Sequence, residues 1–156
     1  YLWELKGQIL FEFGRTAEAE EPQRRSVQLK PEAPLLRVNL GQTLIALNSK
    51  AKIEEGVGEL KRALTQEEDN AVAWRLLAEA HDKLGEDGLA RLATAEYNFY
   101  IGDKRQARVF AMRAREMLNR GTPEWRRATD IVLVAEPTRD DLRDLAREGS
   151  VNSTRR

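Results

Sequence analysis

The stretch "WELKGQILFEFGRTAEAEEPQRRSVQLKP", from Trp3 to Pro31, decides the fold because its small residues return later in the chain. Trp3 and Trp74 lie 71 residues apart. The same distance separates three further pairs: Gly7 and Ala78, Gly14 and Gly85, and Ala19 and Ala90. Gly41 follows Gly7 by 34 residues. We infer a 34-residue repeat whose middle copy carries an insertion of three residues.

Each repeated position has a physical role that predicts a pair of helices. A small residue in mid-helix, such as Gly7, lets a partner helix approach closely. Gly14 and Gly85 follow the last apolar residues of a helix, where a left-handed cap is expected. Pro31 ends the second helix of the first pair. The helices predicted from this pattern span residues 2–13, 17–29, 34–47, 53–66, 71–84, 87–101, 104–119 and 123–135.

The predicted fold is all-α, a right-handed solenoid of antiparallel helical hairpins with about eight helices. Thr122 and Thr138 are expected N-caps, and Thr138 opens a short further helix to Arg147. Gly56 and Gly58 cost about 1 kcal/mol each relative to alanine inside a helix, so we expect the second hairpin to be the loosest.

The expected repeat domain covers residues 1–135, and a short helix with a flexible tail follows at 136–156. Gly102 and Ala107 repeat the spacing of Gly85 and Ala90 half a period later, which predicts a shifted hairpin. The expected units are repeats at 1–33, 34–70 and 71–103, the shifted hairpin at 87–119 and a capping helix at 123–135.

The composition is that of a soluble helical protein. Of 156 residues, 41% are apolar and 33% charged, and 26 basic side chains balance 26 acidic ones. No net charge favours nucleic acid or an anionic membrane, so neither is an expected partner. No apolar run approaches the roughly 20 residues of a membrane span. Cysteine is absent, which excludes disulfides and thiolate chemistry.

The sequence offers no catalytic constellation. His81 is the only histidine, too few for a catalytic zinc site, and we expect it to be packed in a helix. No glycine-rich phosphate loop is present, and the carboxylate pairs are adjacent in sequence, which points them about 100° apart on a helix. We therefore predict no enzyme activity, no metal and no cofactor for this chain.

The segment 104–120 is strongly basic, with six Lys or Arg side chains against Asp103 and Glu116. Phe110 groups with apolar residues on the side expected to be buried, so aromatics are not interleaved with the charges as a nucleic-acid surface would require. We favour a solvated face for this helix. Anion or partner binding is the alternative.

Helical-hairpin solenoids present a concave surface on the first helix of each pair. This surface mixes apolar anchors, amides and both signs of charge, which suits an extended peptide or a protein surface as ligand. Its predicted contacts are Glu4, Leu5, Gln8, Phe11, Glu12, Val38, Asn39, Gln42, Ile45, Arg75, Leu76, Glu79 and Asp82.

The pattern W-x3-G-x6-G-x4-A-x11-P from Trp3 to Pro31 resembles the tetratricopeptide repeat. More narrowly, residues 1–135 resemble the C-terminal repeat domain of bacterial M48-family zinc metalloproteases. The shared marks are "ELKGQILFE" followed by "GR", Pro22, "PLLR", the opening tryptophan, the half-repeat shift and the final P-x-W-x-x-A-x-D-I. The chain begins with Tyr1 rather than Met, so we expect it to be part of a longer protein.

The resemblance implies a periplasmic parent protein whose zinc-binding protease domain, with His-Glu-x-x-His, lies upstream. The repeats would dock substrates or outer-membrane assembly proteins. None of the family's catalytic residues can be placed on this chain, because the motif is absent. Two alternatives stay open: a stand-alone repeat adaptor that binds peptides, and a structural module that associates into a homo-oligomer.

Overall fold

The computed structural model describes residues 1–148, and these are helical without any strand. They divide into two compact units, the first from Tyr1 to Gly85 and the second beginning at Glu86. The boundary falls at the turn inside the segment 71–103 that was expected as the third repeat. The expected flexible tail at 149–156 lies outside the described residues.

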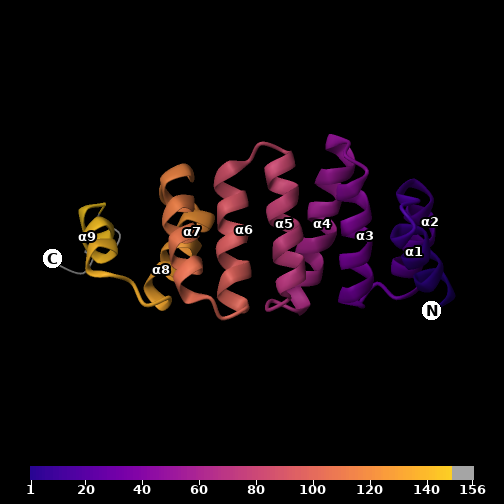
Figure 1. Cartoon of the computed structure of the whole chain (residues 1–156), viewed down its shortest axis with the longest axis horizontal. Helices are drawn as coiled ribbons and strands as arrows, with labels where there is room; N and C mark the ends of the chain where they lie inside the picture. The colour runs from indigo at the N-terminus through magenta and orange to yellow at the C-terminus, as the bar shows by residue number, and fades with distance from the viewer. Residues whose placement is uncertain (149–156) are drawn as a thin grey trace. The chain divides into compact units, whose positions relative to one another are not determined.

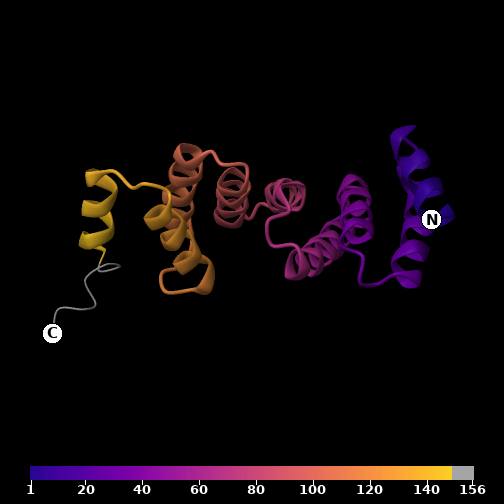
Figure 2. The same ribbon diagram turned by 90° about the horizontal axis from the view of Figure 1, so that it is seen from below.

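The first unit contains five helices: α1 (Leu2–Glu12), α2 (Thr16–Leu29), α3 (Pro34–Ala46), α4 (Lys50–Gln66) and α5 (Ala71–Lys83). Helices α1 and α2 pack as one antiparallel hairpin and α3 and α4 as the next (Figure 1). Helix α3 also contacts α1, α2 and α5. Figure 2 shows α3 and α5 together on one side, with α4 on the other. The helices α1, α3 and α5 thus form one layer of this unit.

Gly56 is unfavourable for helix formation, but its lack of a side chain lets two helices pack closely. A Cβ on Gly56 would lie 3.0 Å from the Gly41 carbonyl oxygen and 3.1 Å from Cγ1 of Ile45. A Cβ on Gly41 would lie 2.9 Å from Cγ of Leu60. The two glycines therefore let α3 and α4 approach each other more closely than side chains would permit. Helix propensity alone, on which we predicted the loosest hairpin, misses this contact.

The second unit contains α6 (Asp87–Tyr100), α7 (Lys104–Met117), α8 (Pro123–Val134) and α9 (Arg139–Arg147). Helices α6 and α7 form a hairpin, and α8 packs against both (Figure 1). Alanines at these contacts keep the helices close. The buried cluster of this unit comprises Leu92, Ala95, Ala107, Ala111, Ala114, Ala128, Ile131, Val132, Ala135 and Leu145.

The structure confirms the predicted fold class, all-α with antiparallel hairpins and a short final helix, within the described residues. Gly14 and Gly85 have φ of +75° and +73°, the left-handed conformation expected after a helix. Thr122 and Thr138 accept hydrogen bonds from the backbone of α8 and α9, and Thr138 and Asp141 form a capping box. Helix α4 starts three residues before its predicted start because Ser49 caps it.

Candidate functional site

Helix α3 is surrounded by other helices on every side except one. Pro34 at the start of α3 and Arg37 are half-buried, and Arg37 is already paired with Glu59 at 2.7 Å. The other exposed or half-buried side chains of α3 form one line: Leu35, Asn39, Gln42 and Ala46. Residues spaced by three and four fall on one face of a helix. This line is therefore the part of α3 that a ligand can reach.

The repeat places equivalent positions on the helices beside α3. On α1 they are Tyr1, Leu5, Gln8 and Glu12, which are 34 residues earlier, and all four are exposed or half-buried. On α5 they are Val72, Leu76, Glu79 and Lys83, of which Leu76 is buried while its neighbour Arg75 is exposed. We call the accessible residues of these three lines, together with Arg75 and Asp82, the α1–α3–α5 face.

Ten of the thirteen residues predicted for the groove have accessible surface. Leu5, Glu12, Arg75, Glu79 and Asp82 are exposed, and Glu4, Gln8, Phe11, Asn39 and Gln42 are half-buried. The prediction is wrong for Val38, Ile45 and Leu76, which are buried. Val38 and Ile45 are seven residues apart on one side of α3, and Ile45 reaches Gly56 of α4. That side packs against neighbouring helices, so it cannot contact a ligand.

An apolar row on this face was missed by the sequence prediction. Tyr1, Leu35 and Val72 are 85%, 58% and 50% exposed. Each lies seven residues, or two helical turns, before a polar residue of the face: Gln8, Gln42 and Glu79, respectively. The sequence could have revealed this row, because an apolar residue stands seven positions before the polar one in all three repeats.

Some polar side chains of the face already form hydrogen bonds or ion pairs within the protein, and others do not. Glu79 pairs with Lys83 at 3.3 Å, and Lys83 also donates to the Ile45 carbonyl at 3.3 Å. Gln8 donates to Glu12 at 2.8 Å. The side chains of Asn39, Gln42, Arg75 and Asp82 have no hydrogen-bond or ion-pair partner within the described part of the chain. An unpaired amide offers both a donor and an acceptor, the pair that a peptide backbone needs.

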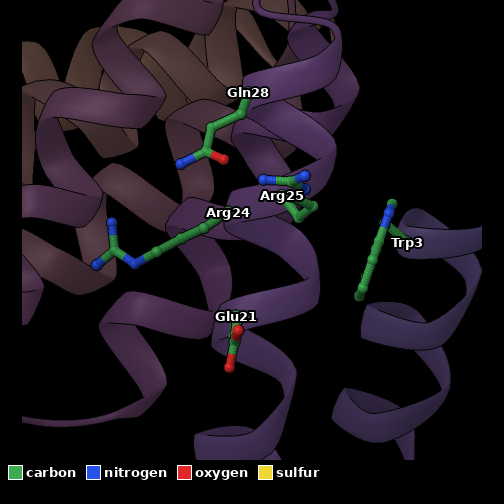
Figure 3. Close-up of a pocket in the computed structure, with 5 residues that line it drawn as sticks. All are labelled: Trp3, Glu21, Arg24, Arg25 and Gln28. Atoms are coloured by element: carbon green, nitrogen blue, oxygen red, sulfur yellow. The ribbon is translucent and has the colours of Figure 1, made fainter.

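Two hollows lie on the α1–α2 hairpin, and Trp3 borders both. The larger, about 450 Å³, is lined by Trp3, Glu21, Arg24, Arg25 and Gln28 (Figure 3). Figure 3 shows Trp3 on α1 across from the α2 side chains, with Arg24 directed away from it. The smaller, about 210 Å³, is lined by Tyr1, Trp3, Glu4, Ser26, Leu29, Lys30 and Leu36. Tyr1 and Glu4 connect this hollow with the first helix of the face.

The charge of Arg24 is taken up by carboxylates of α2 and α4. Its guanidinium contacts Glu55 at 2.5 Å and Glu20 at 2.7 Å, and Lys52 adds a bond of 2.6 Å to Glu20. Hydrogen bonding from Arg24 lowers the pKa of Glu55. Burial opposes ionisation of Glu20, but bonds from Lys52 and Arg24 leave its pKa lowered as well. This network ties α2 to α4 and leaves Arg25 as the unpaired cation of the larger hollow.

Other features bear on chemistry elsewhere in the chain. His81 is buried, as predicted. The described residues include no group of three or more His, Cys, Asp or Glu side chains placed to hold a metal ion. None of the helices within residues 1–148 combines the length and apolarity needed to cross a membrane.

The predicted solvated face of the basic segment 104–120 holds for four of its six cations, which are exposed, but is wrong for Arg108 and Arg115. Arg115 is buried, and Arg108 is largely covered by α8, α9 and the segment between them. The net charge of a segment does not reveal which of its cations have partners inside the fold, so this contact was invisible in the sequence.

Neither a scan against protein-family models nor a search of curated proteins found a match to this chain. The functional interpretation therefore starts from the geometry of the α1–α3–α5 face.

Proposed function

We propose that the chain is a protein-interaction scaffold whose α1–α3–α5 face binds an extended peptide segment of a partner protein. The observation that supports this most directly is the line of unpaired amides, Asn39 and Gln42, beside the exposed apolar side chains of Leu35 and Val72. A surface with apolar anchors and open backbone-binding groups suits a peptide better than a small molecule. Arg75 and Asp82 add one charge of each sign.

The spacing of the helices sets the expected pattern of the ligand. Packed helices lie about 8–10 Å apart, and a peptide in the extended polyproline II conformation rises about 3.1 Å per residue with three residues per turn, so every third side chain lies on the same side. A peptide that crosses α1, α3 and α5 in turn would therefore meet Tyr1, Leu35 and Val72 at intervals of about three residues. We propose a ligand with apolar residues at every third position, which contact the apolar row, and with its backbone about one helical turn further along, near Asn39 of α3.

A synthetic peptide pair tests this proposal. One nine-residue peptide carries leucine at every third position with serine and asparagine between, and the other has the same composition with its leucines contiguous. Titrated into labelled protein and followed by NMR, the spaced peptide should shift the signals of α1, α3 and α5. The contiguous one should bind at least several-fold more weakly. Equal binding of both peptides would contradict the proposed register.

Matched variants locate the binding. Leu35→Glu should reduce binding of the spaced peptide about tenfold or more, because it places a carboxylate in the apolar row. Leu29→Glu is the control, since Leu29 is similarly exposed, at 60%, but lies on α2 outside the face. Loss of binding in the Leu29 variant alone would assign the ligand to the α1–α2 hollows instead.

We further propose, on the tetratricopeptide-like repeat and the M48-like motifs, that this scaffold is the docking domain of a periplasmic zinc metalloprotease. The enzyme's zinc would lie in an upstream domain, and the face would present substrates or outer-membrane assembly proteins to it. The alternatives are a stand-alone adaptor and a self-associating repeat module. The antiparallel hairpins and the open face are compatible with all three.

The intact mass and N-terminal sequence of the native protein, captured from its source cells, separate these alternatives. A species much larger than 17.8 kDa with His-Glu-x-x-His before Tyr1 supports the protease domain. A species of about this mass supports the adaptor. If the mass in solution, measured by sedimentation, rises with protein concentration when no ligand is present, self-association is supported.

A further inference from the structure

A second surface, on α7 and α8 of the second unit, holds a buried arginine in a fixed position. The Arg115 Nε donates to Thr129 Oγ1 at 2.7 Å, and its guanidinium lies 4.6 Å from the centre of the Trp125 ring. Thr129 in turn donates to the Trp125 carbonyl at 3.1 Å. Both of these partners belong to α8, so α8 contributes directly to positioning this cation of α7.

The free end of this guanidinium meets an acidic residue at the end of α9. Arg115 pairs with Glu148 at 2.6 Å, and Arg120 donates to the Glu148 carbonyl. Two turns earlier on α7, Arg108 pairs with Asp141 at 3.2 Å and donates to the Glu136 carbonyl at 2.7 Å. The segment from α9 to Glu148 is therefore joined to α7 by an ion pair near each of its ends.

The spacing of the charges matches on the two helices. Arg108 and Arg115 are seven residues apart, and so are their partners Asp141 and Glu148. Between these partners lies Leu145, which is buried in the apolar cluster formed by α6, α7 and α8. The part of the α9 segment that contacts this surface therefore has a simple pattern. An acidic residue is followed by leucine four positions later and by a second acidic residue three positions after that.

Helix α9 itself has little to hold it in place. It spans nine residues, and Leu145 is the one residue of the helix that is buried. Helices shorter than about 12 residues are marginal on their own. The carboxylate of Glu148 remains 40% exposed in its pair with Arg115, and ion pairs open to water are weakened by salt.

We propose that the α7–α8 surface is a binding site for an acidic amphipathic helix of a partner protein, and that α9 occupies it as an exchangeable ligand of the same chemistry. Charge complementarity argues for this occupant, because two guanidiniums of α7 pair with acidic residues on either side of a leucine that is buried in the apolar cluster. The site lies in the second unit and is independent of the peptide-binding face of the first.

Hydrogen exchange on the native full-length chain tests whether α9 is exchangeable. The α9 amides should exchange at least about tenfold faster than those of α7 and α8, and faster again when NaCl rises from 50 to 500 mM. Glu148→Lys should reproduce the effect of salt at low ionic strength. Asp144→Lys is the control, because Asp144 pairs only with Arg147 of the same helix. Exchange of α9 as slow as that of α7 would overturn the proposal.

A peptide titration tests the binding site itself. The probe is the peptide TRDDLRDLARE, which copies residues 138–148, added to labelled full-length Leu145→Asp protein. We expect this substitution to displace α9, because it puts a carboxylate at the buried position of the helix. The peptide should shift the signals of Trp125 and Thr129 and none in α1–α5, and binding should weaken at least fivefold at 500 mM NaCl. If circular dichroism shows that this variant has lost more helix than the nine residues of α9 account for, Glu148→Lys replaces it in the same titration.

Two controls make the result specific. A peptide with Asp in place of the leucine matching Leu145 and Gln in place of the glutamate matching Glu148 should produce no shifts. Shifts equal to those of the parent peptide would show attraction by charge alone and overturn the proposed pattern. A twelve-residue oligothymidine that shifts Trp125 when the acidic peptide does not would assign the surface to nucleic acid, which also overturns it.

Discussion

Helices α3 and α7 occupy similar places in their units, yet their accessible groups differ in kind. Each packs against more than one other helix of its unit. Helix α3 looks apolar in sequence but presents two half-buried amides, Asn39 and Gln42, that have no hydrogen-bond partner among residues 1–148. Helix α7 looks like an open basic surface, but Arg108 and Arg115 are covered and paired. The comparison shows that availability within the fold, rather than residue type, decides what a surface can bind.

The largest expected effect separates the two sides of α3. Leu44→Ala should destabilise the first unit by about 2–5 kcal/mol, because Leu44 is fully buried and its removal leaves a cavity. Leu35→Ala, the same substitution on the open line, should change stability by less than about 0.5 kcal/mol. Urea unfolding followed by circular dichroism measures both. Similar losses in the two variants would mean that Leu35 is packed, and the proposed face would be wrong.

The next largest effect contrasts two arginines of α7. Arg115→Ala should cost about 2–4 kcal/mol, because it leaves a cavity against Trp125 and removes the partner of Glu148. Arg113 is exposed and lies over the Phe110 ring at 5.3 Å, so Arg113→Ala should cost under about 1 kcal/mol. Thermal unfolding of the two variants gives the comparison. If both variants lose the same small amount of stability, Arg115 is as solvated as Arg113, as the composition of α7 suggested.

Two glycines of α4 test the α3–α4 contact, because replacing them by alanine should change stability in opposite directions. Gly56→Ala should destabilise the first unit by about 1–2 kcal/mol, because its Cβ would press on the Gly41 carbonyl. A Cβ on Gly58 meets nothing within 4 Å, so Gly58→Ala should stabilise the same helix by about 1 kcal/mol. Both are measured by urea unfolding. Stabilisation by both substitutions would restore the expectation that this hairpin is loosely packed.

The helices of this chain could be predicted closely from sequence because their determinants are local. Gly14, Gly85 and Thr122 mark ends by backbone conformation and capping, which depend on a few neighbouring residues. The largest error is the start of α4, by three residues, because the cap at Ser49 was overlooked, and the other ends differ by at most two residues. The repeat register then placed most of the accessible face correctly.

What could not be predicted depends on contacts between distant residues. Val38, Ile45 and Leu76 suit a groove by type, but their burial is set by which helix lies beside them. The fit of Gly56 against Gly41 needs the crossing of α3 and α4, and the pairing of Arg115 needs α9. Neither contact leaves a periodic signal in the chain.

The smallest expected effect concerns pH and the charges that join α2 to α4. The pKa of Glu55 is lowered by hydrogen bonding from Arg24, and that of Glu20 is lowered despite burial by bonds from Lys52 and Arg24. A carboxylate whose pKa is depressed by folding adds stability above its unfolded pKa, near 4.5, and loses it as the pH falls through the folded value. The first unit should therefore lose stability as the pH falls below about 4.5.

Removing one of these carboxylates should flatten that dependence. Glu55→Gln should cost at most about 1 kcal/mol at neutral pH, because the pair is partly open to solvent, and should show a smaller loss in acid than the unmodified chain. Glu54→Gln is the matched control, since Glu54 is exposed and its nearest cation, Lys50, lies 3.9 Å away. Urea unfolding at a series of pH values gives the slopes. If the Glu54 variant flattens the profile as much as the Glu55 variant, the acid response comes from general surface charge, and the Arg24 network contributes nothing specific to joining α2 and α4.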